Sequence, residues 1–152
     1  MQGPPGTGKT YQIANVCREL CSKGKSVLVT ALTNRALMEV AEKDALYDML
    51  STGKIYKTSL TSDEANRLPK LQACKEPTAS SGCVMLSTFY VSSRVATSVQ
   101  QIRRFDVVIM DEASQALLAM FAATKLLGKK NIWVGDIEQL PPVVSFLLLV
   151  NI

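Results

Sequence analysis

Gly3-Pro4-Pro5-Gly6-Thr7-Gly8-Lys9-Thr10 is the stretch of sequence that decides the fold. It matches the Walker A pattern G-x-x-x-x-G-K-[ST], in which glycines let successive backbone N–H groups point at phosphate oxygens. A helix that begins near Lys9 would add its positive end. We expect Lys9 to reach the β- and γ-phosphates of a nucleotide and the Thr10 hydroxyl to lie on Mg²⁺. The alternative at this point is a surface loop rich in glycine and proline that binds nothing.

A pair of carboxylates, Asp111 and Glu112, follows the apolar run Asp106–Met110, as in a Walker B motif. Ligands bind at the carboxyl ends of strands in open α/β sheets. One carboxylate can hold a metal ion through its water shell while the next polarises an attacking water. We therefore assign Asp111 to Mg²⁺ and Glu112 to the general base. An Asp-Glu pair can also merely cap the helix that follows it.

Strand-like and helix-like patterns alternate along the chain. The expected helices are Lys9–Lys23, Asn34–Leu50 (capped by Thr33 or Asn34) and Ala113–Leu127, and the expected strands are Ser26–Ala31, Cys83–Ser87, Asp106–Met110 and Asn131–Gly135. This alternation predicts an α/β fold, a parallel sheet with helices on both faces. Residues 51–80 have weak periodicity, and we interpret them as an insertion or long loop at the edge of one domain spanning residues 1–152.

Four motifs resemble those of superfamily 1 helicases of the Upf-like group, in the family's order. They are Thr30–Ala36 (motif Ia), Ser87-Thr88 (motif Ib), Asp111–Gln115 (motif II) and Gly135–Pro142 (motif III). The resemblance implies a P-loop NTPase of RecA-like fold, the first motor domain of an ATP-dependent helicase or translocase. It also implies ATP and Mg²⁺ as cofactors and single-stranded DNA or RNA as a partner.

The resemblance carries roles to individual residues. Lys9, Glu112 and Gln139 would be catalytic, and Gln139 would contact the γ-phosphate and report its loss to the nucleic acid. Thr33 and Asn34 would lie near the backbone of the single strand, as would Ser87 and Thr88. A cap of the following helix is an equally good interpretation of Thr33 and Asn34, and the two roles can coexist.

The sequence departs from the family pattern at both ends. Only Met1 and Gln2 precede the phosphate loop, so the family's phosphate-loop strand and its adenine-reading glutamine motif are missing from the chain. The second RecA-like domain, which supplies arginine fingers, is absent too, and we expect this chain alone to hydrolyse ATP slowly or not at all. The apolar tail Ser145–Val150 is expected to dock on the sheet, or else to begin a link to a second domain.

Composition is that of an ordinary soluble globular protein. The N-terminus has no signal-peptide pattern, so the expected compartment is the cytoplasm, or the nucleus in a eukaryote. A net charge of +4 permits nucleic-acid binding without requiring it. Four cysteines without a CxxC pair, together with no histidine, argue against zinc. The longest apolar run, Val143–Val150, is too short to cross a membrane.

Two other functions remain open from sequence alone. One is a P-loop ATPase that acts on protein complexes rather than on nucleic acid. The other is a module that binds nucleotide without turning it over. The complete set of Lys9, Thr10, Asp111 and Glu112 argues against the second of these.

Overall fold

Strand β1 (Val27–Ala31) lies inside a parallel sheet of six strands in the order β3-β2-β4-β1-β5-β6. The computed structural model describes residues 8–98, 103–112 and 118–135. The other strands are β2 (Ile55–Thr58), β3 (Gln72–Cys74), β4 (Val84–Thr88), β5 (Phe105–Met110) and β6 (Gly128–Trp133). Every pairing between neighbouring strands is parallel. The carboxyl ends of β1, β4 and β5 therefore lie at the same end of the sheet.

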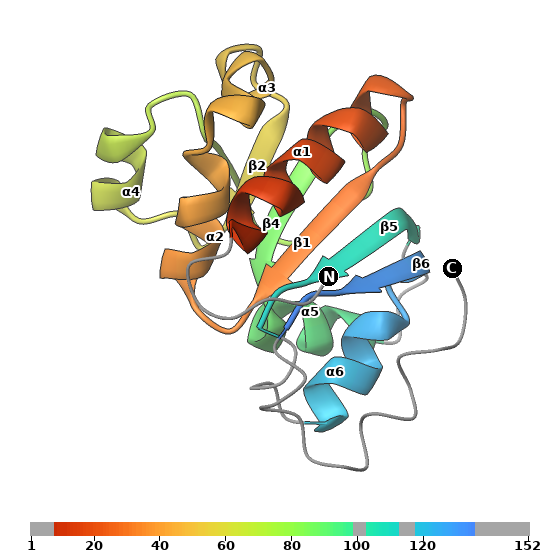
Figure 1. Cartoon of the computed structure of the whole chain (residues 1–152). Coiled ribbons are helices and arrows are strands. Elements are labelled where there is room, and N and C mark those ends of the chain that lie inside the picture. Colours follow the sequence, from red (N-terminus) through yellow and green to blue (C-terminus); the bar gives the residue numbers. More distant parts are fainter. Residues whose placement is uncertain (1–7, 99–102, 113–117, 136–152) are drawn as a thin grey trace.

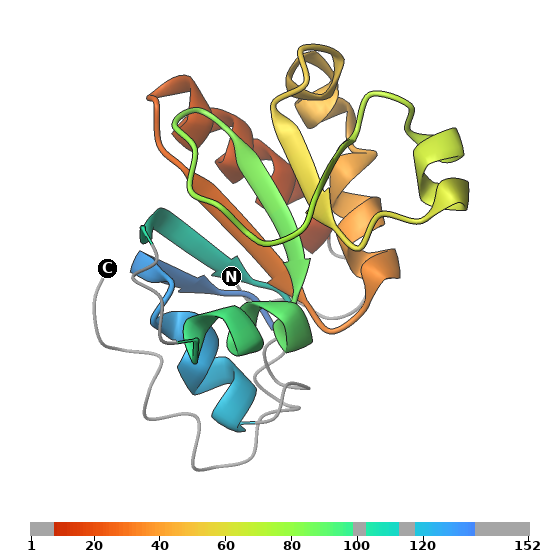
Figure 2. The same ribbon diagram turned by 180° about the vertical axis from the view of Figure 1, so that it is seen from behind.

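Helices cover both faces of this sheet (Figures 1 and 2). The helices are α1 (Lys9–Ser22), α2 (Asn34–Ala41), the 3₁₀ turn η1 (Asp44–Leu46), α3 (Tyr47–Ser51), α4 (Ser62–Arg67), α5 (Phe89–Ala96) and α6 (Leu118–Lys125). One apolar cluster joins α1, α2 and η1 to one face, and a second joins α5 and α6 to the other. The predicted α/β fold, with a parallel sheet and helices on both faces, is confirmed.

The central elements match their predicted positions closely. Strand β1 is buried along its whole length, as expected for an aliphatic strand covered on both faces. Helix α1 buries Ile13, Cys17 and Cys21, three of the residues whose spacing predicted its inner face. Strand β6 begins at Gly128, earlier than predicted, and the helix before it is described only from Leu118 onward.

Two predictions about the segment between β1 and β4 need correction. The expected helix Asn34–Leu50 is interrupted, because Lys43 is extended and the chain turns there so that Ala45 and Leu46 become buried. Residues 51–80 lie at the edge of the sheet but are not a long loop. They contribute β2, α4 and β3 to the fold, and we call β2 and α4 together the edge unit.

The apolar tail Ser145–Val150, predicted to dock on the sheet, lies outside the described residues. Within those residues, no helix combines the length and the hydropathy needed to cross a membrane.

Candidate nucleotide site and nucleic-acid face

The last glycine of the phosphate loop, Gly8, is the N-cap of α1 and has a positive φ of 75°. A Cβ atom added at Gly8 would meet nothing within 4 Å, so backbone conformation, rather than space, requires glycine here. No side chain caps this helix, so the N–H groups of its first turn are left to other acceptors such as phosphate. Lys9 and Thr10 occupy that turn, and the predicted phosphate ligands Gly3, Pro4, Pro5, Gly6 and Thr7 lie outside the described residues.

Asp111 directly follows β5 and lies on the side of the sheet that α1 covers. Side chains alternate along a strand, and Val107 and Ile109 belong to the apolar cluster beneath α1. The backbone N–H of Asp111 donates to the Thr30 carbonyl at 2.8 Å, which continues the pairing of β5 with β1. The positive charge of Lys9 lowers the pKa of the Asp111 carboxyl. The fold thus brings the beginning of α1 and the end of β5 together (Figure 1).

Asp111 is only 9% exposed, and burial raises the pKa of its carboxyl above the ordinary value. The nearby negative charges of Glu112 and Glu39 raise the pKa further, whereas the Glu112 N–H and the charge of Lys9 lower it. The Glu112 N–H donates to Asp111 Oδ1 at 2.9 Å. Within the described residues, Asp111 forms no ion pair closer than 4 Å. A buried, incompletely compensated carboxylate is a suitable partner for a hydrated cation.

Glu112 has a φ of 53°, in the left-handed region that residues other than glycine rarely adopt. Such strained backbone is concentrated at functional sites, where the surrounding structure holds it in place. The conformation ends β5 abruptly and leaves Glu112 half-exposed beside the buried Asp111. The two carboxylates thus occupy different environments, one buried and one open to solvent, which is consistent with the different roles predicted for them.

The residues present fit Mg²⁺ with a nucleoside triphosphate. Mg²⁺ prefers oxygen ligands and retains several waters, so one carboxylate and one hydroxyl suffice alongside phosphate oxygens. Asp111 would supply the carboxylate, and Thr10, half-buried in the first turn of α1, would supply the hydroxyl. The predicted γ-phosphate contact, Gln139, lies outside the described residues.

We expect Asp111→Asn to stabilise the nucleotide-free protein at neutral pH. An acid with a raised pKa takes up protons on folding, so the free energy of unfolding falls as pH rises through the window between its ordinary and raised pKa. Above that window the substitution should raise the free energy of unfolding, since a neutral amide is less costly to bury than an ionised carboxylate. Thermal unfolding at pH 7 without Mg²⁺ measures the change.

Asp106→Asn is the matched control, because Asp106 lies in β5, the strand that Asp111 follows, and its pKa is shifted in the opposite direction. Its carboxylate accepts hydrogen bonds from Lys129 at 2.8 Å and from the Ser26 N–H at 2.9 Å, and these hold its pKa below the ordinary value. Stability from a lowered pKa is present above the unfolded pKa and is lost on acidification. Asp106→Asn should therefore destabilise at pH 7. Equal destabilisation by the two substitutions would contradict the account of Asp111.

The residues predicted to contact nucleic acid lie just after β1 (Thr33 and Asn34) and at the end of β4 (Ser87 and Thr88), two neighbouring strands. Thr33 caps α2 by accepting from the Ala36 N–H at 3.2 Å, and Thr88 caps α5 through the Val91 N–H at 3.4 Å. The helix-cap interpretation is thus correct for Thr33, whereas Asn34 is the first residue of α2. The cap that Thr88 forms was not predicted. Thr33 and Asn34 are exposed, so a nucleic-acid strand could also reach them.

Ser87 differs from these three residues because it is completely buried. Its hydroxyl accepts a hydrogen bond from the Thr58 hydroxyl at 3.1 Å, which ties β4 to β2. Ser87 therefore links the ends of β4 and β2 inside the fold, and its side chain is not exposed to a nucleic-acid backbone. Contacts by Thr33, Asn34 and Thr88 remain predictions.

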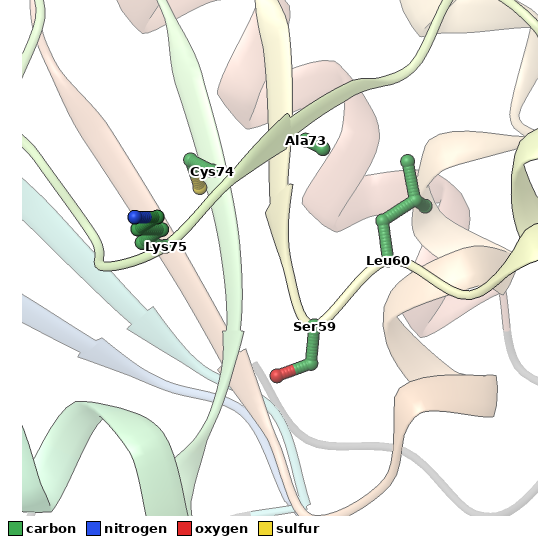
Figure 3. A pocket seen from close by; sticks show the side chains of 5 residues that line it. All are labelled: Ser59, Leu60, Ala73, Cys74 and Lys75. Carbon is green, nitrogen blue, oxygen red and sulfur yellow. The ribbon is translucent and has the colours of Figure 1, made fainter.

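Sequence reasoning missed Lys57, a completely buried lysine at the end of β2 that bonds to Asn34. Beside it, an open cavity at the carboxyl ends of β2 and β3 is lined by Ser59, Leu60, Ala73, Cys74 and Lys75 (Figure 3). Strands β4 and β1 separate this cavity from β5 and its carboxylates. The cavity is thus distinct from the nucleotide site, and no pattern in the sequence pointed to it.

The topology and the site define a P-loop NTPase domain of RecA-like type: a parallel sheet, a phosphate-loop helix and a carboxylate pair after a central strand. Residues 1–145 match a family described as "AAA domain", and the chain belongs to that family. The helicase names of the relatives, together with this match, confirm the resemblance to a superfamily 1 helicase motor domain.

Two relatives illustrate the similarity. The DNA replication ATP-dependent helicase/nuclease dna2 of Schizosaccharomyces pombe is 32% identical over 153 residues, covering 94% of this chain and 10% of that protein. The DNA replication ATP-dependent helicase/nuclease DNA2 of Homo sapiens is 30% identical over 151 residues, covering 93% of this chain and 14% of that protein. The chain thus spans between a tenth and a seventh of these relatives' length.

Among solved structures, the chain is similar to the nonstructural protein 10 helicase of an arterivirus. The TM-score is 0.49 at 18% identity, and the match covers 95% of this chain and 30% of that one. The fold assignment rests instead on the strand order and the parallel pairings of the sheet.

Proposed function

We propose that the chain binds and hydrolyses Mg-ATP as the first motor domain of an ATP-dependent helicase or translocase that acts on single-stranded DNA. One arrangement carries this proposal. Helix α1 begins at Lys9 without a side-chain cap, and it packs on the face of the sheet where β5 ends in the buried Asp111 and in Glu112 with its positive φ. The names of the relatives, DNA replication helicase/nucleases, favour DNA over RNA as the nucleic acid.

Each residue of the site has a distinct proposed task. Lys9 and the N–H groups of the first turn of α1 neutralise phosphate charge as it redistributes during transfer. Thr10 and Asp111 hold Mg²⁺, which when bound draws charge from the phosphate oxygens. Gln139 senses the γ-phosphate. The site thereby combines phosphate binding and metal binding within one corner of the sheet.

Glu112 is the proposed general base of hydrolysis. Glu112 orients a water towards the γ-phosphorus. It accepts a proton from that water as the water oxygen forms its bond to phosphorus. The bond between the γ-phosphorus and the bridging oxygen then breaks, and ADP and inorganic phosphate leave. Its half-exposed position supports this role, since water can reach a carboxylate there.

The exposed turn after β1 and the start of α5 form the proposed DNA face. Thr33, Asn34 and Thr88 lie at the carboxyl ends of adjacent strands, and Thr33 and Asn34 begin α2 with its positive helix end. Hydroxyl, amide and backbone N–H donors are the usual ligands of phosphate oxygens in a nucleic-acid backbone. The position of these donors beside the nucleotide site would allow hydrolysis and strand movement to be coupled.

Turnover of the intact protein, measured with and without single-stranded DNA, tests the proposed function, since this chain alone is expected to hydrolyse ATP slowly or not at all. Stimulation by an oligothymidylate is expected, with less stimulation by duplex DNA of equal length. A protein-remodelling ATPase would hydrolyse ATP without responding to either, and a nucleotide-binding module would show saturable binding without turnover. Either result would replace the proposal.

We expect Gln139→Ala to uncouple hydrolysis from movement along the strand. A glutamine that follows the strand beside β5 can respond to the γ-phosphate, as switch segments do in other phosphate-driven proteins. Basal turnover should change by only a few-fold, while DNA stimulation should be largely lost. A variant with normal stimulation and normal translocation would remove Gln139 from the coupling mechanism.

A further inference from the structure

Lys57 is the only lysine or arginine in the described part of the chain whose side chain is completely buried. Lysines are almost never fully buried unless they are paired, because removing the ammonium from water is costly. The residue lies in β2, on the face of the sheet that α2 covers, since it follows Ile55 by two residues. The role of Lys57 therefore depends on the polar groups that pair with its ammonium.

The ammonium group of Lys57 is saturated by three close acceptors from three segments. Nζ donates to Asn34 Oδ1 at 2.9 Å, to Glu64 Oε2 at 2.9 Å and to the Thr58 carbonyl at 3.2 Å. A longer contact of 3.5 Å reaches the carbonyl of Ser59. An ammonium has three donors, so none is left for an external ligand. Lys57 can affect a ligand only through the groups that it holds.

Glu64 fastens this network to α4. Its Oε2 also accepts from the Thr61 N–H at 3.0 Å, and the Thr61 hydroxyl accepts from the Glu64 N–H, which completes a capping box. Burial alone would raise the pKa of Glu64, but hydrogen bonds from Thr61 and Lys57 hold the pKa below its ordinary value. The carboxylate therefore remains ionised at neutral pH and keeps Lys57 paired.

The contact with Lys57 also determines how the Asn34 amide is oriented. Lysine has donors and no acceptor, so Asn34 must present its oxygen to Nζ. The amide nitrogen, with two N–H donors, then points away from Lys57. Asn34 is exposed and is the first residue of α2. Its donors are thus displayed at the positive end of that helix, where an anionic oxygen is favoured.

We propose that Lys57 is a positioning residue for DNA binding: it holds the Asn34 amide so that the NH₂ group donates to a backbone phosphate of the single strand. Through Glu64, the edge unit is also linked to the turn after β1 that carries Thr33 and Asn34. The inference rests on the proposed function, because it assigns a phosphate contact to Asn34. It adds a buried residue that never touches DNA but controls one that does.

A double-mutant cycle on DNA affinity tests the proposal. The affinity of the protein for a fluorescent oligothymidylate is measured by anisotropy for Lys57→Met, Asn34→Ala and the double variant. Each single substitution should weaken binding by about tenfold, as expected for one hydrogen bond to a charged group. The double variant should lose no more than either single one, because both remove the same contact. Additive losses would overturn the proposal.

Salt dependence separates positioning from direct contact. A basic side chain that binds a phosphate contributes about 0.7 to the slope of log affinity against log salt on single strands. Because Lys57 is buried, Lys57→Met should leave that slope unchanged. A slope lowered by about 0.7 would mean that Lys57 binds the strand itself.

Asn34→Asp provides a variant that keeps the network intact. Its carboxylate still accepts from Lys57, so thermal stability should equal or exceed that of the wild type. DNA affinity should nevertheless fall below that of Asn34→Ala, since an anion replaces the donors that face the phosphate. Wild-type affinity in Asn34→Asp would overturn the proposal, even if Lys57→Met fails to fold.

The outcomes also separate this inference from the proposed function. If the wild-type protein hydrolyses ATP but does not bind single-stranded DNA, then the DNA-binding part of the proposed function fails and this inference fails with it. If the wild-type protein binds DNA and only the cycle is additive, then Lys57 is structural and the proposed function stands.

Discussion

Glu112→Gln should lower the rate of ATP hydrolysis by about 10²–10⁴-fold, the contribution typical of a general base. The amide is nearly the same size as the carboxylate but cannot accept the proton of the attacking water. Nucleotide affinity should be retained, because Lys9, Thr10 and Asp111 remain in place. The loss is measured as turnover at saturating ATP, and affinity is measured separately with a fluorescent ATP analogue.

Glu39→Gln is the matched control for this substitution. The charge of Glu39 acts on Asp111, yet its side chain pairs with Arg35 on the surface of α2 at 3.2 Å. The same chemical change there should leave turnover within about twofold, since surface charges of this kind contribute little. Full turnover in Glu112→Gln would instead assign the base to a different group.

The centre of the fold can be predicted from sequence because burial on both sides leaves a simple signal. Strands β1 and β5 are nearly continuous aliphatic runs, and each is fully or almost fully buried. Helix α1 was predictable for a different reason, since its apolar residues recur at helical spacing after a glycine-rich loop. In each case the decisive pattern is local, so neighbours distant in the sequence did not need to be known.

The edge of the sheet could not be predicted in the same way. Strand β2 reads Ile-Tyr-Lys-Thr, and its second half would ordinarily be assigned to solvent. Lys57 and Thr58 are buried there because Asn34, Glu64 and Ser87 satisfy their polar groups. These partners lie between 7 and 29 residues away along the chain. Such a strand becomes recognisable only when the tertiary contacts are known.

Helix α5 was also overlooked, although its start carries a local signal. Thr88 caps it through the Val91 N–H, and Phe89, Ser92 and Val95 form its buried side. Their spacing of three residues is helical, but the run of eight residues is short and contains two serines. The strand before it masks the boundary, because Thr88 ends β4 and caps α5 at once.

The candidate nucleotide site was more predictable than the proposed DNA face. Phosphate binding requires glycines, a lysine and a hydroxyl at fixed local spacing, so the sequence alone can indicate it. In the structure, α1 begins at Lys9 on the face of the sheet that also carries Asp111. The proposed DNA face depends on exposed side chains whose orientation is determined by buried residues. Asn34 could be singled out from its motif, but Lys57, which determines the direction of its amide, is separated from it by 23 residues.

Lys9→Ala should weaken the binding of Mg-ATP by roughly 10–100-fold, because a hydrogen bond to a charged group contributes about 1.5–3 kcal/mol. The phosphates lose a positive charge, and Asp111 loses a cationic side chain that lowers its pKa. Lys25→Ala is the matched control: it removes an equal charge from an exposed position just past the far end of α1. Titration of both variants with a fluorescent ATP analogue, with and without Mg²⁺, measures the difference. Equal weakening in the two variants would mean that overall charge, rather than a contact from Lys9, attracts the nucleotide.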